Sequence, residues 1–141
     1  MSLLKNPGFE VGSEFWFRSN KSEAVSFSID KDPSIAKSGE KFLRMRTSSA
    51  AGSIAQDFTS KAPSVSALAY VKAAGASVSG TMALWDLNAG VSSSTRFTVG
   101  QQWTLLANML GTGSGIDRKI RVEFYLDTPN ADLLIDSVTA F

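Results

Sequence analysis

The side chains best suited to bind a ligand occupy alternating positions in a few short apolar segments. In Ile120-Arg-Val-Glu-Phe-Tyr-Leu-Asp127 every second residue is apolar, and Arg121, Glu123 and Tyr125 share the opposite face. Aromatic rings can stack on a flat apolar surface of a ligand while polar side chains hydrogen-bond its polar groups. The candidate ligand or partner surface comprises Tyr70, Tyr125, Arg44, Arg46, Lys72, Arg121, Glu123 and Trp85.

The composition argues against catalysis. The chain contains no histidine and no cysteine, so the usual general base near neutral pH and the thiolate nucleophile are both missing. No two carboxylates occur in a context that would raise one pKa and leave the other normal, as a glycosidase requires. We therefore expect no catalytic residue and a protein that is not an enzyme.

The charge balance also excludes several partners. The chain has 14 Lys and Arg against 13 Asp and Glu, a net charge of +1, without runs of like charge. Nucleic acid and membrane surfaces are therefore not expected as partners. No segment approaches the roughly 18 apolar residues that a membrane span needs. The first residues lack the features of a secretion signal, so we expect none.

The elements that position these side chains are predicted to be strands. Short stretches of alternation recur between turn signals such as Asp32-Pro33, Asn88-Ala-Gly90 and Thr128-Pro-Asn130. The predicted strands are Phe15 to Ser19, Ala24 to Asp30, Lys41 to Thr47, Ser53 to Phe58, Val65 to Ala73, Ser79 to Leu87, Ser93 to Val99, Trp103 to Leu110, Lys119 to Asp127 and Leu133 to Phe141. This pattern indicates an all-β chain, a single β-sandwich domain over residues 1–141 built from two packed antiparallel sheets.

Three of these strands divide clearly into two faces. In Lys41 to Thr47, Leu43 and Met45 point one way and the two arginines the other. The strand Val65 to Ala73 separates its valines and alanines at odd positions from Leu68, Tyr70 and Lys72. The polar faces of the three strands could form one mixed binding surface. The alternative is a solvated outer sheet face, which antiparallel sheets commonly show.

The two ends of the chain carry a resemblance to a known family. The motifs "NPGFEVG" followed by Trp16, "SGEKFLRMRT" at 38–47, "IAQDFTSKAPSVSALAYVKA" at 54–73 and "VEFYLDTPNADLLIDSVTAF" at 122–141 resemble the jelly-roll carbohydrate-binding modules of families 4, 9 and 22. Such modules are appended to xylanases and related glycosidases. The resemblance covers nearly the whole chain and implies a two-sheet antiparallel jelly roll.

The same resemblance implies a structural calcium ion. In the family, the turn at the N-terminus lies beside the last strand, which would place Glu10 and Asp136 as carboxylate ligands. Carbonyl groups near Gly8 and in the turn from Lys37 to Lys41 would complete the oxygen-rich shell that calcium prefers. Without a metal, Glu10 would hydrogen-bond its own turn and Asp136 would cap a strand end. Either way we expect a latch in which Gly8 adopts a conformation closed to other residues.

The three tryptophans are expected at different places in the sandwich. Trp103 precedes an apolar strand where the family packs a core tryptophan, so we expect it in the core. Trp16 is expected in the core or at the rim of the sandwich, and Phe9 is expected to plug one end. The side on which Trp85 lies is left open by its neighbours, because both phases of its strand contain apolar residues.

Two functions fit this sequence. The first is a virion decoration or cement protein. The chain is similar to such proteins in its size, its composition and its architecture of one free-standing domain. It would bind the major capsid protein of a tailed phage, or copies of itself as a homo-oligomer, after synthesis in the host cytoplasm. Its contact residues would be Leu3, Leu4, Phe15, Phe17, Trp85 and Phe141. The alternative is a carbohydrate-binding module for a plant or bacterial polysaccharide, extracellular and part of a secreted enzyme.

Overall fold

The computed structural model describes residues 2–5, 7–10, 12, 15–112 and 115–141. These residues form ten strands and one short 3-10 helix at Ser22–Ala24. The strands are β1 (Phe17–Arg18), β2 (Val25–Lys31), β3 (Lys41–Thr47), β4 (Ser53–Ser60), β5 (Ser64–Ala73), β6 (Val78–Asp86), β7 (Val91–Val99), β8 (Thr104–Gly111), β9 (Arg118–Leu126) and β10 (Asp132–Ala140). Each predicted strand is present, and most of their ends differ by one or two residues. No helix in these ranges is long and apolar enough to cross a membrane.

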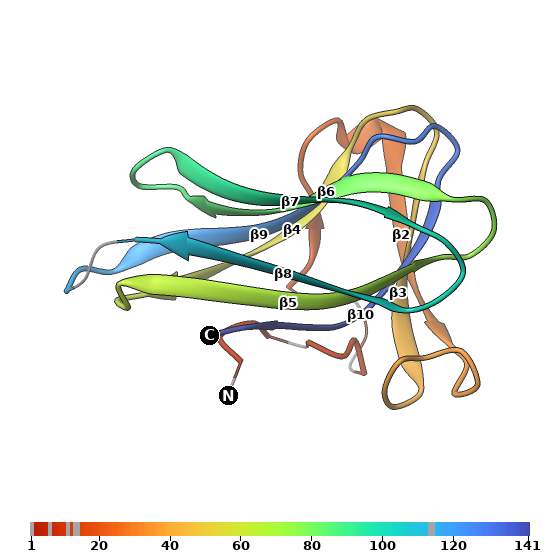
Figure 1. The fold of residues 1–141 in the computed structure, drawn as a ribbon, viewed down its shortest axis with the longest axis horizontal. Helices are drawn as coiled ribbons and strands as arrows, with labels where there is room; N and C mark the ends of the chain where they lie inside the picture. Colours follow the sequence, from red (N-terminus) through yellow and green to blue (C-terminus); the bar gives the residue numbers. More distant parts are fainter. Residues whose placement is uncertain (1, 6, 11, 13–14, 113–114) are drawn as a thin grey trace.

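The strands form two sheets of five, stacked as two layers (Figure 1). Sheet A has the order β1-β4-β9-β6-β7, and sheet B has the order β2-β3-β10-β5-β8. Every pairing is antiparallel, and consecutive strands often lie in different sheets. The predicted all-β fold of two antiparallel sheets is therefore confirmed.

The core lies between the sheets and is filled by the inward phase of each strand. In β9 the buried residues Ile120, Val122, Phe124 and Leu126 alternate with Arg121, Glu123 and Tyr125 on the outer face. The same alternation buries Leu43 and Met45 of β3 against the other layer. Because each strand presents one apolar face to the opposite sheet, every second side chain is left on an outer face.

The ends of the chain lie side by side, as the latch prediction requires (Figure 1). The backbone N–H of Leu3 donates to the carbonyl of Ala140, and that of Val138 donates to the carbonyl of Pro7. Phe9 is fully buried, with its ring centroid 5.4 Å from that of Trp16, which is also in the core. The predictions for Phe9 and Trp16 are confirmed.

Two details of the latch differ from the predictions. The left-handed backbone conformation belongs to Phe9, with a φ of 60°, whereas Gly8 is not among the residues with positive φ. Burial of the Phe9 ring accounts for a conformation that a non-glycine residue rarely adopts. Leu4, expected as a contact residue, is instead part of the core. Asn6 of the same turn lies outside the described residues.

Candidate binding site on the outer face of sheet A

Four of the predicted surface residues meet on the outer face of sheet A. Strand β9 lies between β4 and β6 and contributes Arg121, Glu123 and Tyr125. Trp85 of β6 pairs with Arg121, which places its indole on the same face. The side of Trp85, which the sequence left open, is therefore the outer face of this sheet.

A chain of hydrogen bonds joins these side chains. The indole Nε1–H of Trp85 donates to the hydroxyl of Tyr125 at 3.2 Å, and that hydroxyl donates to Oε1 of Glu123 at 2.6 Å. The other carboxylate oxygen, Oε2, accepts from the Ser53 hydroxyl, which itself accepts from the backbone N–H of Asn20 at 2.8 Å. Each side chain in this series of hydrogen bonds is oriented by its neighbours, so the rings of Trp85 and Tyr125 are held in one orientation.

Glu123 is buried although it points outward, because its neighbours in the sheet are small. It pairs with Ala55 on β4 and with Ala83 on β6, and only 3% of its surface is exposed. The space left by two methyl groups accommodates the carboxylate, and the larger side chains beside it exclude water. A buried carboxylate requires hydrogen bonds, which Tyr125 and Ser53 supply here, and the neighbouring charge of Arg121 also interacts with it.

A second polar pair lies beside this chain. The guanidinium of Arg121 binds Asp57 of β4 through Nε–H at 2.7 Å and through Nη2–H at 3.0 Å. These hydrogen bonds raise the pKa of Arg121. Its Nη1 group makes no hydrogen bond with the residues that the structure describes, so its donors remain for a ligand. The same guanidinium lies 5.2 Å from the ring of Phe17, which extends the aromatic surface to β1.

The face is hollowed into a pocket of about 350 Å³, within the size range of ligand pockets. The residues that line it are Ser19, Asn20, Trp85, Leu87, Arg121, Glu123 and Tyr125. Aromatic walls with convergent donors and acceptors can stack on one face of a sugar and hydrogen-bond its hydroxyl groups. The predicted surface did not include Ser53, Asp57 or Asn20. Ser53 and Asp57 of β4 reach this face by pairing with β9, and Asn20 lies in the turn that follows β1.

The environment of Tyr125 gives a direct test of the hydrogen-bond chain. Burial, the hydrogen bond to Glu123 and the charge of that carboxylate raise the pKa of Tyr125 from 10.0 to about 12. A raised pKa means that this group favours the folded state below pH 10 and loses that contribution as the pH rises through about 12. We therefore expect phenolate absorbance to show a tyrosine ionisation near pH 12, which belongs to Tyr125. Tyr125→Phe should remove the late ionisation and Tyr70→Phe should leave it. A late step that persists in Tyr125→Phe would contradict the assignment.

The other four predicted residues lie on the opposite side of the molecule. Arg44 and Arg46 are on β3, Tyr70 and Lys72 are on β5, and all four face outward from sheet B. The single mixed surface that the alternation suggested is therefore wrong, because β3 and β5 belong to one sheet and β9 to the other. The eight residues form two groups, one on each outer face.

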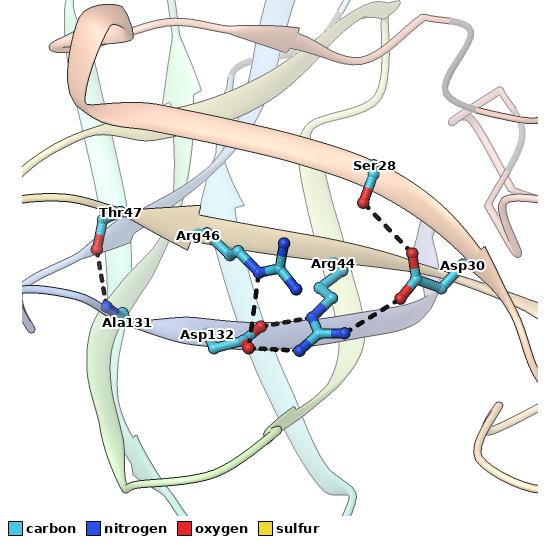
Figure 2. A network of polar contacts seen from close by, with 7 residues as sticks. All are labelled: Ser28, Asp30, Arg44, Arg46, Thr47, Ala131 and Asp132. Carbon is cyan, nitrogen blue, oxygen red and sulfur yellow. Dashed lines mark hydrogen bonds and ion pairs between the residues drawn. The ribbon is translucent and has the colours of Figure 1, made fainter.

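Arg44 and Arg46 are engaged in a network of ion pairs (Figure 2). Arg44 points between two carboxylates, with two bonds to Asp132 at 2.8 and 2.6 Å and one to Asp30 at 3.4 Å. Arg46 approaches Asp132 at 3.7 Å. The hydrogen bonds from Arg44 hold the pKa of Asp132 below its usual range, and Asp132 raises the pKa of Arg44. This network joins β2, β3 and β10 and leaves little of Arg44 for a ligand.

Trp103 also differs from its prediction. Its indole is half-buried on the outer face of sheet B, not in the core, and its Nε1–H donates to the carbonyl of Ile35 at 2.8 Å. The apolar residues that follow it, Leu106 and Leu110, are the ones that face inward. Trp103 precedes them by odd numbers of positions and so falls on the opposite face.

The predicted metal ligands do converge on one turn. Glu10 accepts the backbone N–H groups of Glu40 and Lys41, while Asp136 accepts those of Lys37 and Ser38. Among the residues that the structure describes, the carboxylate of Glu10 therefore bonds a distant turn and not its own. Gly39, with a φ of 62°, lies against the Glu10 carboxylate, where a Cβ atom would come within 2.8 Å. A larger residue there would have to displace this carboxylate and adopt a left-handed backbone conformation, and glycine avoids both.

Both carboxylates suit a hard cation such as calcium. Asp136 is fully buried, and burial together with the charge of Glu10 raises its pKa against the opposing effect of its backbone hydrogen bonds. No described Lys or Arg forms an ion pair with it. The described residues contain no group of three or more acidic, Cys or His side chains that could hold a metal, so calcium would need backbone carbonyl oxygens as well. The metal stays a prediction.

The fold by itself defines the class of structure. Across its whole length the chain has the β-sandwich fold of carbohydrate-binding modules, which is shared with solved modules of families 61, 22, 16 and 11. The resemblance in the sequence motifs is therefore confirmed at the level of fold.

Two small modules match over nearly their full lengths. The module TmCBM61, solved with beta-1,4-galactotriose, is 19% identical with a TM-score of 0.69, over 100% of this chain and 98% of its own. The CBM22-1 xylan-binding domain of Xyn10C from Paenibacillus barcinonensis is 17% identical with a TM-score of 0.73, over 99% of this chain and 93% of its own. At these identities the likeness shows the fold alone.

A third match comes from a phage. The enzymatically active domain of tailspike protein 4 from bacteriophage CBA120 is 13% identical with a TM-score of 0.72, and the match covers 99% of this chain but 21% of the tailspike chain. No protein-family model matches the sequence, and no curated protein matches it. The structures named here are carbohydrate-binding modules and a tailspike, so the predicted role as a capsid decoration protein gains no support.

Proposed function

We propose that the chain is a non-catalytic carbohydrate-binding module that holds a neutral polysaccharide on the outer face of sheet A. The observation that carries this proposal is the chain of hydrogen bonds from Trp85 through Tyr125 to the buried carboxylate of Glu123. It presents two aromatic rings in fixed orientations beside unused donors of Arg121. Rings whose orientation is already fixed lose little entropy when a ligand stacks on them.

The charges of the face favour a neutral ligand. Asp57 neutralises Arg121 through two hydrogen bonds, and Lys119 lies 3.7 Å from the same carboxylate. The remaining carboxylate, Glu123, is buried under its own hydrogen bonds. Hydroxyl groups of a neutral sugar can exchange hydrogen bonds with these groups without burying a further charge.

The same contacts argue against hydrolysis. A glycosidase needs one carboxyl group that can donate a proton and a second that is free to attack or to activate water. Both oxygens of Glu123 accept hydrogen bonds from Tyr125 and Ser53, and both oxygens of Asp57 are occupied by Arg121. Neither carboxylate is available for those roles, which supports a binding function.

Affinity electrophoresis against soluble polysaccharides tests this proposal. The panel comprises xylan, beta-1,4-galactan and a beta-1,3-1,4-mixed-linked glucan, because the structural neighbours include a xylan-binding domain and modules solved with a galactotriose and a mixed-linked tetrasaccharide. We expect at least one polysaccharide to retard the folded protein relative to a non-binding reference protein. Normal migration in every gel would overturn the proposal.

Light scattering on the same sample addresses the virion alternative. A monomer that is retarded by a polysaccharide would exclude the cement role, whereas a stable oligomer that no polysaccharide retards would favour it. If a polysaccharide binds the protein, we propose that the chain acts outside the cell, as part of a secreted enzyme.

A further inference from the structure

The largest pocket among those described lies on the opposite side of the molecule, on the outer face of sheet B. Its volume is about 620 Å³. It forms because residues 32–40 fold back over the sheet, where the carbonyl of Ile35 accepts the indole N–H of Trp103 and the backbone N–H of Asp32 donates to the carbonyl of Glu40. Nothing in the proposed polysaccharide site uses this pocket.

The floor of the pocket is apolar. Phe42 of β3 and Leu134 of β10 point outward from sheet B, yet only 3% and 4% of their surfaces are exposed. Both line the pocket together with Ile35 of the covering segment. These residues lie apart from the main core, so their burial creates a separate apolar surface on an otherwise polar face. Such a floor suits the apolar face of a ring.

Two cations flank this floor, and only one of them is neutralised. Leu134 pairs with Arg44 on one side and with Lys72 on the other. Arg44 is held by Asp132 and Asp30, as described above. The ammonium of Lys72 lies 5.2 Å from the ring of Trp103 and forms no ion pair with any residue in the described part of the chain.

The remaining charged and polar groups of the lining have ion-pair or hydrogen-bond partners. Lys31 pairs with Glu40 at 3.3 Å, and Asp32 accepts hydrogen bonds from the hydroxyl and the backbone N–H of Ser34. Gln101, at the rim, donates to the carbonyl of Gly75. Lys72 is therefore the one cation in the described lining without an opposite charge or a hydrogen-bond partner, and the ring of Trp103 positions it. Asp32 keeps its negative charge, because Ser34 supplies only hydrogen bonds.

We infer that this pocket binds an acidic sugar residue, a hexuronate, with its carboxylate on the ammonium of Lys72 and one ring face on Phe42 and Leu134. A carboxylate supplies the charge that Lys72 lacks, and an ammonium-carboxylate contact in a partly enclosed pocket is among the stronger polar interactions. The site is on the opposite sheet from the proposed polysaccharide site. One molecule would then hold a neutral and an acidic glycan on its two faces at once.

The test compares two sugars that differ only in charge. Methyl beta-D-glucuronide and methyl beta-D-glucoside are titrated into the protein at low salt while backbone amide signals are followed by NMR. We expect the glucuronide to shift signals of β3, β5 and β10 around the pocket, and the glucoside to bind more weakly. Lys72→Gln should weaken glucuronide binding about tenfold, because it removes the charge from a charge-assisted contact. Added salt should weaken it as well.

Matched variants separate this site from the one on sheet A. Lys61→Gln removes an exposed lysine elsewhere and should leave glucuronide binding unchanged, and so should Trp85→Ala. Equal binding of the two sugars, or equal binding by Lys72→Gln and the unmodified protein, would overturn the inference. So would loss of glucuronide binding in Trp85→Ala with retention in Lys72→Gln. Because the probe is a monosaccharide on sheet B, absence of polysaccharide retardation would not affect this result.

Discussion

Replacing Trp85 by alanine is expected to abolish the retardation of the protein by its polysaccharide while leaving it folded. The indole forms one wall of the pocket on sheet A and orients the hydroxyl of Tyr125 through its N–H. Loss of a central aromatic contact typically costs at least about 2 kcal/mol, or roughly 30-fold in affinity. Isothermal titration with the polysaccharide that retards the protein most strongly measures the change.

The control for this experiment is the other half-buried tryptophan on an outer face. Trp103→Ala removes an indole of the same size from sheet B and should keep the affinity for the neutral polysaccharide. Circular dichroism establishes that both variants are folded. If Trp85→Ala bound as tightly as the unmodified protein, or if Trp103→Ala lost binding instead, the site on sheet A would be assigned to the wrong face.

Replacing Asp136 by alanine is expected to destabilise the fold strongly. Asp136 is fully buried and accepts the backbone N–H groups of Lys37, Ser38 and Ser137. Alanine would leave these three donors without their acceptor, at a cost of about 2 kcal/mol or more in the free energy of unfolding. Urea unfolding provides the measurement.

Asp32→Ala is the matched control, because Asp32 also accepts hydrogen bonds from a turn but lies at the surface. Its loss of stability should be clearly smaller. Equal losses for the two variants would show that the contacts of Asp136 with the turn at Lys37 and Ser38 contribute no more than surface hydrogen bonds do.

The same unfolding curves test the predicted calcium ion. Because the pKa of Asp136 is raised, its protonated form favours folding at low pH, and this contribution is lost as the pH rises through the pKa of the folded state. Above that pKa the buried negative charge is a cost that a bound cation would offset. Calcium should therefore raise the stability of the unmodified protein near neutral pH, less at acidic pH, and not in Asp136→Ala. An unchanged midpoint with calcium at neutral pH would exclude the metal.

Much of this fold could be predicted from the sequence because strand alternation is a local property. The phase of apolar residues identified every strand and assigned Ile120, Val122 and Leu43 to the core. Alternation predicted single residues less reliably than whole strands. Trp103 was expected in the core, but it lies on the outward-facing side of its strand. Gly8 was expected to adopt the unusual backbone conformation of the latch, which its neighbour Phe9 adopts.

Alternation in the sequence determined, for most strand positions, which side chains leave the core, and only the tertiary structure decided which of them meet. Tyr70 and Tyr125 occupy equivalent outward positions in their strands, yet they lie on opposite sheets, because β5 and β9 pair with different partners. The burial of Glu123 likewise depends on Ala55 and Ala83, which are distant in sequence and reach it only through strand pairing. Alternation follows from the geometry of one strand, whereas sheet order and register follow from contacts between segments far apart in the chain, which no local pattern encodes.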